Sequence, residues 1–291
     1  MMKIVLMADS SSGISQKEAK ELGVLIAPVP VYINDEQYFE DLTLTQEQFY
    51  KKLQEDANVS TSQPNPDTVA EMWAKALEDN DAVIYVPISS GLSETGHILA
   101  KVAENDERFR GKVFVADNHR VSITQRQSVL DALAMAKDGK TAQEIYDYMM
   151  ETAPKTSIYI MVDTLKYLKK GGRLTPAAAA IGTLLKIKPV LQIQGEKLDQ
   201  YAKVRKVSDA KRTMMDAIKK DLTTRFKDYT DAGKMTFAIA HTNNLAEAEK
   251  FRDEVKAEFP NVEFTVIKPL SLSVASHIGP GALAIGCVSK Y

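Results

Sequence analysis

The sequence has few of the residues that mark disulfide-rich, zinc-binding or membrane proteins. Among 291 residues there is one cysteine, Cys287, so the chain cannot form an internal disulfide or a cysteine-rich zinc site. The four histidines are widely separated, without a His-x-His or His-Glu-x-x-His pair, so we expect no metal site. No apolar run reaches the length of a membrane-spanning helix, and the apolar stretch that follows Lys3 is too short for a signal peptide. We therefore expect a cytoplasmic protein without integral membrane contact.

The chain also lacks an excess of charge of one sign. Its 37 basic and 39 acidic residues give a net charge of −2, whereas nucleic-acid-binding domains usually carry a strong basic excess. The Gly-x-Gly-x-x-Gly loop of dinucleotide-binding proteins is missing after the first predicted strand, where Asp9-Ser10-Ser11-Ser12-Gly13 stands. Nucleic acid and dinucleotides are therefore not expected partners.

Apolar, β-branched runs alternate with helical spacing in the first half of the chain. This alternation predicts a parallel sheet with helices on both faces. Within it, Asn34-Asp35 is a predicted turn, and Thr45 and Thr141 begin predicted capping boxes. The predicted strands and helices that define the sheet are Ile4–Ala8, Ala82–Val86, Leu92–Ala103, Lys112–Ala116 and Val121–Ala136.

A boundary is expected at Ala153-Pro154-Lys155, which separates an N-terminal α/β domain (residues 1–153) from a C-terminal α/β domain (residues 154–291). In the C-terminal part, Ile187–Ile193 and Leu198–Val204 flank a Gln-Gly-Glu turn and are predicted to pair antiparallel. The C-terminal sheet is therefore expected to be mixed. With 291 residues, the chain is long enough for two domains of ordinary size.

Two serine-rich turns follow predicted strands. Ser89-Ser90-Gly91-Leu92-Ser93 lies between a strand and a helix, and Asp9-Ser10 begins a similar turn after the first strand. Ligands of open α/β sheets bind at the carboxyl ends of the strands, where the next helix directs its free N–H groups. We expect Ser89, Ser90 and Ser93 to hold an anion or polar headgroup; the alternative is a turn that only caps a helix.

Three further motifs lie in predicted loops. Thr61-Ser62-Gln63-Pro64 is predicted to form an exposed bend before a helix that begins at Pro66, and an ordinary Ser/Thr turn is the alternative. Gly171-Gly172 ends a short predicted helix and projects Arg173. In His277-Ile278-Gly279-Pro280-Gly281 the glycines allow a sharp turn where a Cβ would obstruct a ligand.

In order and spacing these motifs resemble those of the DegV family, and the resemblance extends over nearly the whole chain. Asp9-Ser10, Ile187-Lys188-Pro189 and Lys203-Val204-Arg205 also fit. The resemblance implies a two-domain DegV-like α/β fold that binds one long-chain fatty acid in a tunnel between its domains. It further implies a carrier without catalytic residues, cofactor or ATP site, which presents the fatty-acid carboxylate to a separate ATP-dependent kinase. The acyl phosphate produced would be used for phospholipid synthesis.

The resemblance also assigns roles to individual residues. A buried carboxylate costs several kcal/mol unless charge-assisted donors surround it, and hydroxyls, helix N–H groups and an imidazole can supply them. Arg173 is expected to contact the kinase or the transferring phosphate. The expected carboxylate ligands are Thr61, Ser62, Ser93 and His277. The expected supporting residues of the headgroup loops are Asp9, Ser10, Ser89, Ser90, Gly279 and Gly281.

Three residues depart from the family pattern. Glu94 stands where the family usually has glycine, and its charge would compete with a bound carboxylate unless it points away. Ile123 and Arg126 replace the small residues that are common in relatives, and they could narrow the tail tunnel or change the ligand class. The acyl chain length and saturation therefore remain open.

A serine hydrolase acting on an acyl ester is the alternative function. Ser93, Asp163 and His277 occur in the chain order of an α/β-hydrolase triad. The nucleophile elbow, however, needs Gly-x-Ser-x-Gly, and the segment Gly91–Gly96 is one residue too long. The carrier reading is therefore preferred.

Overall fold

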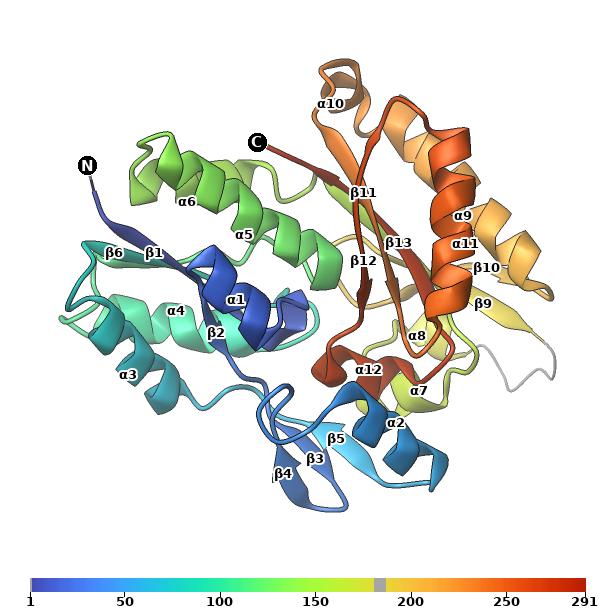
Figure 1. Cartoon of the computed structure of the whole chain (residues 1–291), viewed down its shortest axis with the longest axis horizontal. Helices are drawn as coiled ribbons and strands as arrows, with labels where there is room; N and C mark the ends of the chain where they lie inside the picture. Colours follow the sequence, from blue (N-terminus) through green and yellow to red (C-terminus); the bar gives the residue numbers. More distant parts are fainter. Residues whose placement is uncertain (1, 181–186) are drawn as a thin grey trace. The chain divides into compact units, whose positions relative to one another are not determined.

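The chain folds into two compact units, seen in a computed structural model that describes residues 2–180 and 187–291 (Figure 1). Unit 1 contains the chain through Pro154 together with Ser271–Ser273 and Tyr291, and unit 2 contains Lys155–Leu270 and Val274–Lys290. Within the described residues, no helix has both the length and the apolarity needed to cross a membrane.

A four-stranded parallel sheet forms the centre of unit 1, as the alternation of strands and helices predicts. Strand β1 pairs in parallel with both β2 and β6, and β6 pairs in parallel with β7. The strands, in spatial order, are β2 (Leu25–Ala27), β1 (Ile4–Asp9), β6 (Ala82–Val86) and β7 (Val113–Val115). Because parallel strands end at the same edge of a sheet, the serine-rich turns after β1 and β6 are neighbours.

Helices cover both faces of this sheet because successive strand residues point to opposite sides. Leu6 and Ile84 face one core, while Met7 and Tyr85 face the other, where Trp73 packs edge to face on Tyr85. The first core is covered by α1 (Gln16–Leu22), α5 (Ser122–Lys137) and α6 (Ala142–Glu151). The second is covered by α3 (Pro66–Ala76) and α4 (Thr95–Asn105). Unit 1 is therefore a three-layer α/β structure.

A small antiparallel sheet, which the sequence patterns do not predict, also belongs to unit 1. Its strands, in spatial order, are β4 (Glu36–Tyr38), β3 (Val31–Ile33) and β5 (Val59–Thr61), and α2 (Gln46–Gln54) follows β4 in the chain. The turn expected at Asn34-Asp35 is confirmed, since both residues have the positive φ of a two-residue hairpin, 50° and 70°. The capping box predicted at Thr45 is also present.

Unit 2 is built on a six-stranded mixed sheet. The predicted antiparallel pairing of its first hairpin is confirmed, and β11 with β12 is the parallel pair. The strands, in spatial order, are β10 (Asp199–Val204), β9 (Lys188–Ile193), β8 (Thr156–Met161), β13 (Leu283–Ser289), β11 (Met235–His241) and β12 (Glu263–Pro269).

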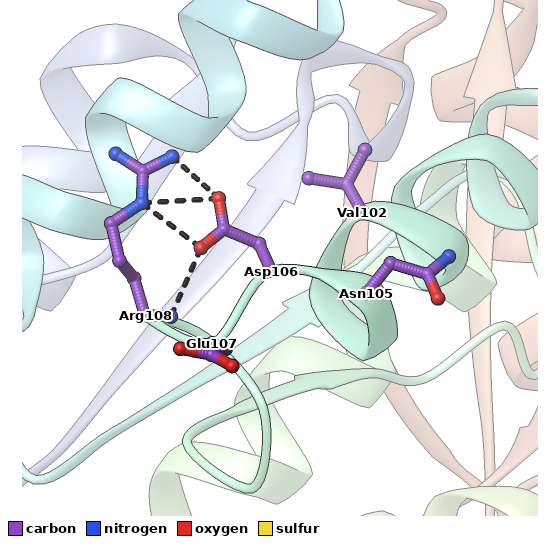
Figure 2. A pocket seen from close by; sticks show the side chains of 5 residues that line it. All are labelled: Val102, Asn105, Asp106, Glu107 and Arg108. Carbon is purple, nitrogen blue, oxygen red and sulfur yellow. Dashed lines mark hydrogen bonds and ion pairs between the residues drawn. The ribbon is translucent and has the colours of Figure 1, made fainter.

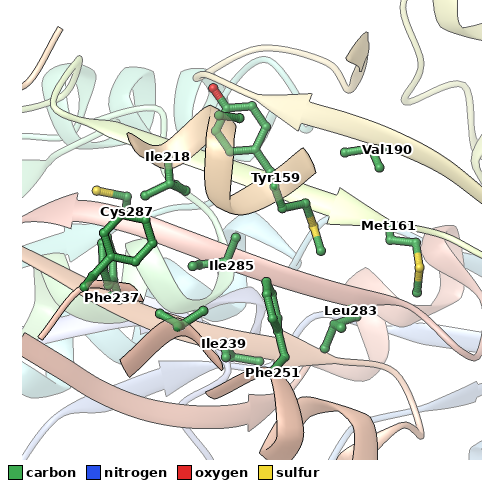
Figure 3. Close-up of a cluster of buried hydrophobic side chains, with 14 of the residues drawn as sticks. Tyr159, Met161, Val190, Ile218, Phe237, Ile239, Phe251, Leu283, Ile285 and Cys287 are labelled. Atoms are coloured by element: carbon green, nitrogen blue, oxygen red, sulfur yellow. The ribbon is translucent and has the colours of Figure 1, made fainter. Parts of the chain in front are cut away.

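Two long helices cover one face of this sheet and enclose the core shown in Figure 3. Ile218 of α9 (Val207–Thr223) and Phe251 of α11 (Leu245–Glu258) pack with Phe237 and Ile285 of the strands. Lys211 joins the helices through ion pairs with Glu247 (2.7 Å) and Glu254 (2.5 Å). The shorter helices are α7 (Lys166–Gly171), α8 (Pro176–Ala179), α10 (Lys227–Asp231) and α12 (Leu272–Ile278), and the first two residues of α12 belong to unit 1.

Candidate functional site

Asp9 holds together the loops at the carboxyl ends of β1 and β6. Its carboxylate accepts hydrogen bonds from the backbone N–H groups of Ser11 (3.0 Å) and Ile88 (2.7 Å) and from Gln125 Nε2 (3.2 Å). The side chain is fully buried, and burial raises the pKa of Asp9 although these hydrogen bonds oppose the shift. Asp9 therefore supports the loops from inside.

The serines after β1 are also turned toward the protein interior. Ser10 Oγ accepts a hydrogen bond from the backbone N–H of Val29 at 3.0 Å, and Ser12 Oγ donates to the carbonyl of Asp9 at 2.9 Å. Ser11 Oγ lies 3.4 Å from Ser273 Oγ, next to the start of α12. All three serines are buried, and the hydroxyls of Ser10 and Ser12 bond backbone groups.

The turn after β6 is fixed by the loop that follows β7. Ser89 is fully buried, its N–H donates to the carbonyl of Arg120 (2.9 Å), and its Oγ accepts from the N–H of Gly91 (3.1 Å). The N–H of Ser90 donates to Asp117 (3.3 Å), and Ser90 Oγ lies 3.5 Å from His119 Nδ1. Contacts with the residues that follow β7 therefore fix the position of this turn.

Ser93 lies two residues before the start of α4, which begins at Thr95 and not at Leu92 as predicted. The backbone N–H of Ser93 donates to the carbonyl of Ser89 at 3.1 Å. Its hydroxyl lies 2.8 Å from Thr95 Oγ1 and accepts a hydrogen bond from the N–H of Thr95 at 3.3 Å. Ser93 itself is half-buried.

Glu94 points away from the loop. Its side chain is 74% exposed, makes no cap hydrogen bond to α4 and lies 3.4 Å from His97 Nδ1. The Glu94 carboxylate therefore lies in solvent, as the binding of a carboxylate ligand beside it would require.

Thr61 lies at the end of a strand and not in the predicted exposed bend, whereas Ser62 is exposed as predicted. Thr61 is the last residue of β5, half-buried and paired in register with Val31. Ser62 comes directly after the strand and is exposed, with its Oγ donating to the carbonyl of Gln63 at 3.2 Å. The sequence missed the strand because each strand of this sheet is only three residues long.

In unit 2, His277 lies in the last turn of α12 against Gly171 at the end of α7. A Cβ atom at Gly171 would stand 2.2 Å from His277 Nδ1, so only glycine leaves room for the ring. Burial lowers the pKa of His277 to about 4, and the positive charge of Arg173 adds to this effect. The imidazole is therefore neutral near pH 7 and carries a single N–H donor.

Arg173 follows Gly172, which ends α7 with the left-handed φ of 69° that the double glycine predicts. The guanidinium folds back toward the helix, with Nη1 donating to the carbonyl of Gly171 at 2.5 Å. Arg173 is half-buried. Its charge is therefore held at the carboxyl end of α7, where it complements the helix dipole.

The turn after His277 depends on its two glycines. Gly279 and Gly281 have φ values of 79° and 84°, and a Cβ at these positions would stand 2.3 Å from Tyr167 and 2.5 Å from Asp163. Asp163 Oδ1 is paired with Lys188 Nζ at 2.6 Å. The glycines therefore allow close packing of this turn, and their role here is structural.

The geometry gives the serine hydrolase alternative no support. Asp163 pairs with Lys188, and the lowered pKa of His277 makes its imidazole a weak general base. The hydroxyl of Ser93 is bonded to Thr95.

The other two departures from the family pattern are buried or paired in unit 1. Ile123 is 4% exposed. Arg126 donates two hydrogen bonds to the single oxygen Glu18 Oε1, from Nε (3.0 Å) and Nη2 (2.6 Å). The charge of Arg126 is thus bound by a carboxylate of α1.

A surface pocket at the end of α4 is lined mainly by polar and charged side chains (Figure 2). Asp106 accepts hydrogen bonds from Arg108 Nη2 (2.5 Å) and Nε (3.0 Å), and this contact lowers the pKa of Asp106. The pocket is also lined by Val102, Asn105 and Glu107. A carboxylate ligand would have to displace Asp106, and one aliphatic side chain offers little to an acyl chain.

In residues 2–180 and 187–291, no group of three His, Cys, Asp or Glu side chains could hold a metal ion.

The fold defines the class of protein to which the chain belongs. Its structure superposes on that of a fatty-acid-binding DegV family protein from Thermus thermophilus with a TM-score of 0.89 and 28% identity, covering 99% of this chain and all of that one. It superposes on DegV of Bacillus subtilis, described as a fatty-acid-binding protein, with a TM-score of 0.86 and 28% identity over the whole of both chains. These matches confirm the predicted two-part α/β fold with one parallel and one mixed sheet.

The sequence comparisons agree with the fold. The model of the family described as "Uncharacterised protein, DegV family" matches residues 3–290. A DegV domain-containing protein of Halalkalibacterium halodurans is 29% identical over 287 residues, which cover 98% of each chain. The chain belongs to the DegV family.

Proposed function

We propose that this chain binds one long-chain fatty acid and holds its carboxylate through Thr61, Ser62, Ser93 and His277. The observation that carries the proposal is the position of Ser93, a half-buried residue in the loop at the carboxyl edge of the parallel sheet. It is supported by the two relatives of 28% identity whose descriptions name fatty-acid binding.

The chemistry of these residues suits a carboxylate. Hydroxyls and a neutral imidazole are hydrogen-bond donors, and such bonds to a charged acceptor are roughly twice as strong as neutral ones. The neutral state of His277 matters here, because its lowered pKa leaves one N–H donor without adding a buried charge. The Glu94 side chain, next to Ser93 in the chain, is 74% exposed, so its carboxylate lies in solvent.

Calorimetric titration of delipidated protein with palmitate tests the proposal. We expect one site per chain, and about tenfold weaker binding or more in Ser93→Ala and His277→Ala, because each loses a hydrogen bond to a charged group. Ser60→Ala is the matched control, since Ser60 is exposed on β5 and points away from Thr61. Wild-type affinity in both site variants would remove the assignment.

We further propose that the protein works in the cytoplasm as the non-catalytic carrier of a fatty acid kinase system. A separate ATP-dependent kinase would phosphorylate the presented carboxylate, and the acyl phosphate would enter phospholipid synthesis. Arg173 is our candidate for contact with the kinase or the transferring phosphate, because it places a cation at the end of α7.

This second proposal has its own experiment. The loaded protein is mixed with a fatty acid kinase and ATP, and acyl phosphate is trapped with hydroxylamine. Arg173→Ala should bind palmitate normally but yield at least tenfold less hydroxamate, whereas Lys169→Ala, which removes an exposed cation of the same helix, should react normally. Equal yields from Arg173→Ala and wild type would refute the role of Arg173.

A further inference from the structure

The hydroxyl of Ser93 forms a pair with the hydroxyl of Thr95. The two oxygens are 2.8 Å apart, and the backbone N–H of Thr95 donates to Ser93 Oγ at 3.3 Å. Thr95 is the first residue of α4 and is 2% exposed, whereas Ser93 is half-buried. Of the two residues, Ser93 is therefore the one that is not fully buried.

The direction of the hydrogen bond within this pair decides what Ser93 can do. Each hydroxyl has one proton to donate and two lone pairs that accept. If Ser93 donated to Thr95, its proton would be used internally and its oxygen would face the ligand as an acceptor. If Thr95 donates to Ser93, the Ser93 proton is free to point outward.

A carboxylate ligand selects the second arrangement because an ionised carboxylate accepts hydrogen bonds and donates none. Two donors of Thr95, its N–H and its O–H, then occupy the lone pairs of Ser93 Oγ. Hydrogen bonds received by a hydroxyl also polarise it and strengthen the bond that it donates.

We propose that Thr95 is a positioning residue, whose hydroxyl donates to Ser93 Oγ and so directs the Ser93 proton to the carboxylate of the bound fatty acid. The inference rests on the proposed function and adds a residue that does not itself touch the ligand. The structure around the pair supports this role. Glu94, at the N-cap position of α4, makes no side-chain cap bond, so the bond from the Thr95 N–H to Ser93 Oγ links the helix start to the ligand-facing hydroxyl.

Two substitutions separate the hydroxyl of Thr95 from its shape. Thr95→Val keeps the shape and removes the donor, whereas Thr95→Ser keeps the donor and removes a methyl group. We expect palmitate binding to weaken about 5- to 10-fold in Thr95→Val and to stay within about twofold of wild type in Thr95→Ser. Thr152→Val is the matched control, since Thr152 is 1% exposed in the same unit and its hydroxyl donates to the carbonyl of Tyr148 at 2.8 Å.

A double-mutant cycle tests whether Thr95 acts through Ser93. Once Ser93→Ala has removed the receiving hydroxyl, adding Thr95→Val should weaken binding by less than about twofold more. The carboxyl ¹³C resonance of bound [1-¹³C]palmitate gives a second readout. It should move in the same direction in Ser93→Ala and Thr95→Val and stay unchanged in Thr152→Val and Thr95→Ser, a pattern that loss of stability alone would not produce.

Three results would overturn the inference. They are wild-type affinity in Thr95→Val, a full additional loss from Thr95→Val in the Ser93→Ala protein, and equal losses in Thr95→Val and Thr95→Ser. If Thr95→Val does not fold, a loss of affinity with a shifted carboxyl resonance in the folded Thr95→Ser protein would also overturn it, because the donor is still present there. If the proposed function itself is wrong, wild-type protein will bind no palmitate, which differs from the results above. The inference would then be refuted as well.

Discussion

Replacement of Gly171 by alanine is expected to disturb ligand binding without unfolding the protein. Gly171 is the last residue of α7, and its φ is not in the left-handed region. Alanine at a helical position is normally worth about 0.5–1 kcal/mol of stability over glycine. The added Cβ would, however, stand 2.2 Å from His277 Nδ1 and 3.2 Å from its Cγ, so the imidazole must move.

The size of the effect follows from the bond that His277 is proposed to make. A hydrogen bond to a charged group contributes about 1.5–3 kcal/mol, which corresponds to roughly 10- to 150-fold in affinity. We expect Gly171→Ala to lose a similar fraction of palmitate affinity to His277→Ala. The midpoint of urea unfolding should change little, because the helix propensity gained offsets the displacement of a half-buried ring.

Calorimetry with palmitate and urea unfolding measure the two quantities separately. Gly172→Ala is the control, since a Cβ there meets nothing within 4 Å but the φ of 69° is strained for alanine. It should lose stability, about 1 kcal/mol, and keep its affinity. If Gly171→Ala binds as tightly as wild type while His277→Ala does not, the ring moves without consequence and the packing argument is refuted.

Three further predictions concern titratable groups that are buried or half-buried. In delipidated protein the His277 ring should titrate near pH 4, so its contribution to stability is complete above pH 6.5 and is lost as the pH falls toward 4; an NMR midpoint near 6.5 would contradict this. Burial raises the pKa of Glu40, which accepts the N–H of Leu272 at 2.8 Å, to about 7, so its contribution to stability should decline as the pH rises from 4.5 through 7. Glu40→Gln should remove this slope, and thermal melts at pH 5 to 8 that run parallel to wild type would refute it. Asp9→Ala should cost about 2–4 kcal/mol in urea unfolding because buried N–H groups, that of Ile88 among them, lose their acceptor; a loss below 1 kcal/mol would contradict its role.

Local signals were sufficient for much of the fold. The capping boxes at Thr45 and Thr141 and the helix that begins at Pro66 are all present, because each is set by residues within one helical turn. The apolar runs of β1 and β6 likewise lie where the sequence predicts them.

Structure that depends on distant contacts was missed. The helix α12 carries two serines, which favour caps and turns over helix interiors, and its first N–H group, that of Leu272, is held by Glu40, far away in the chain. The small sheet of β3, β4 and β5 has strands too short to show alternation.

The loops of the candidate site could be identified from the sequence, but the directions of their side chains could not. Asp9 and Ser10 turned out to bond the backbone inside unit 1, whereas Ser93 is only half-buried. Thr95 was overlooked as a partner, although a threonine two residues after a serine at a helix start is a signal that could have found it.

The most direct test of the central claim is mass spectrometry of what the purified protein carries. Wild type, Ser93→Ala and the control Ser60→Ala are denatured and extracted, and fatty acid is quantified per chain. We predict a stoichiometric long-chain fatty acid in wild type and Ser60→Ala and strong depletion in Ser93→Ala. Wild-type protein that carries no fatty acid and takes up none when it is added would contradict the account.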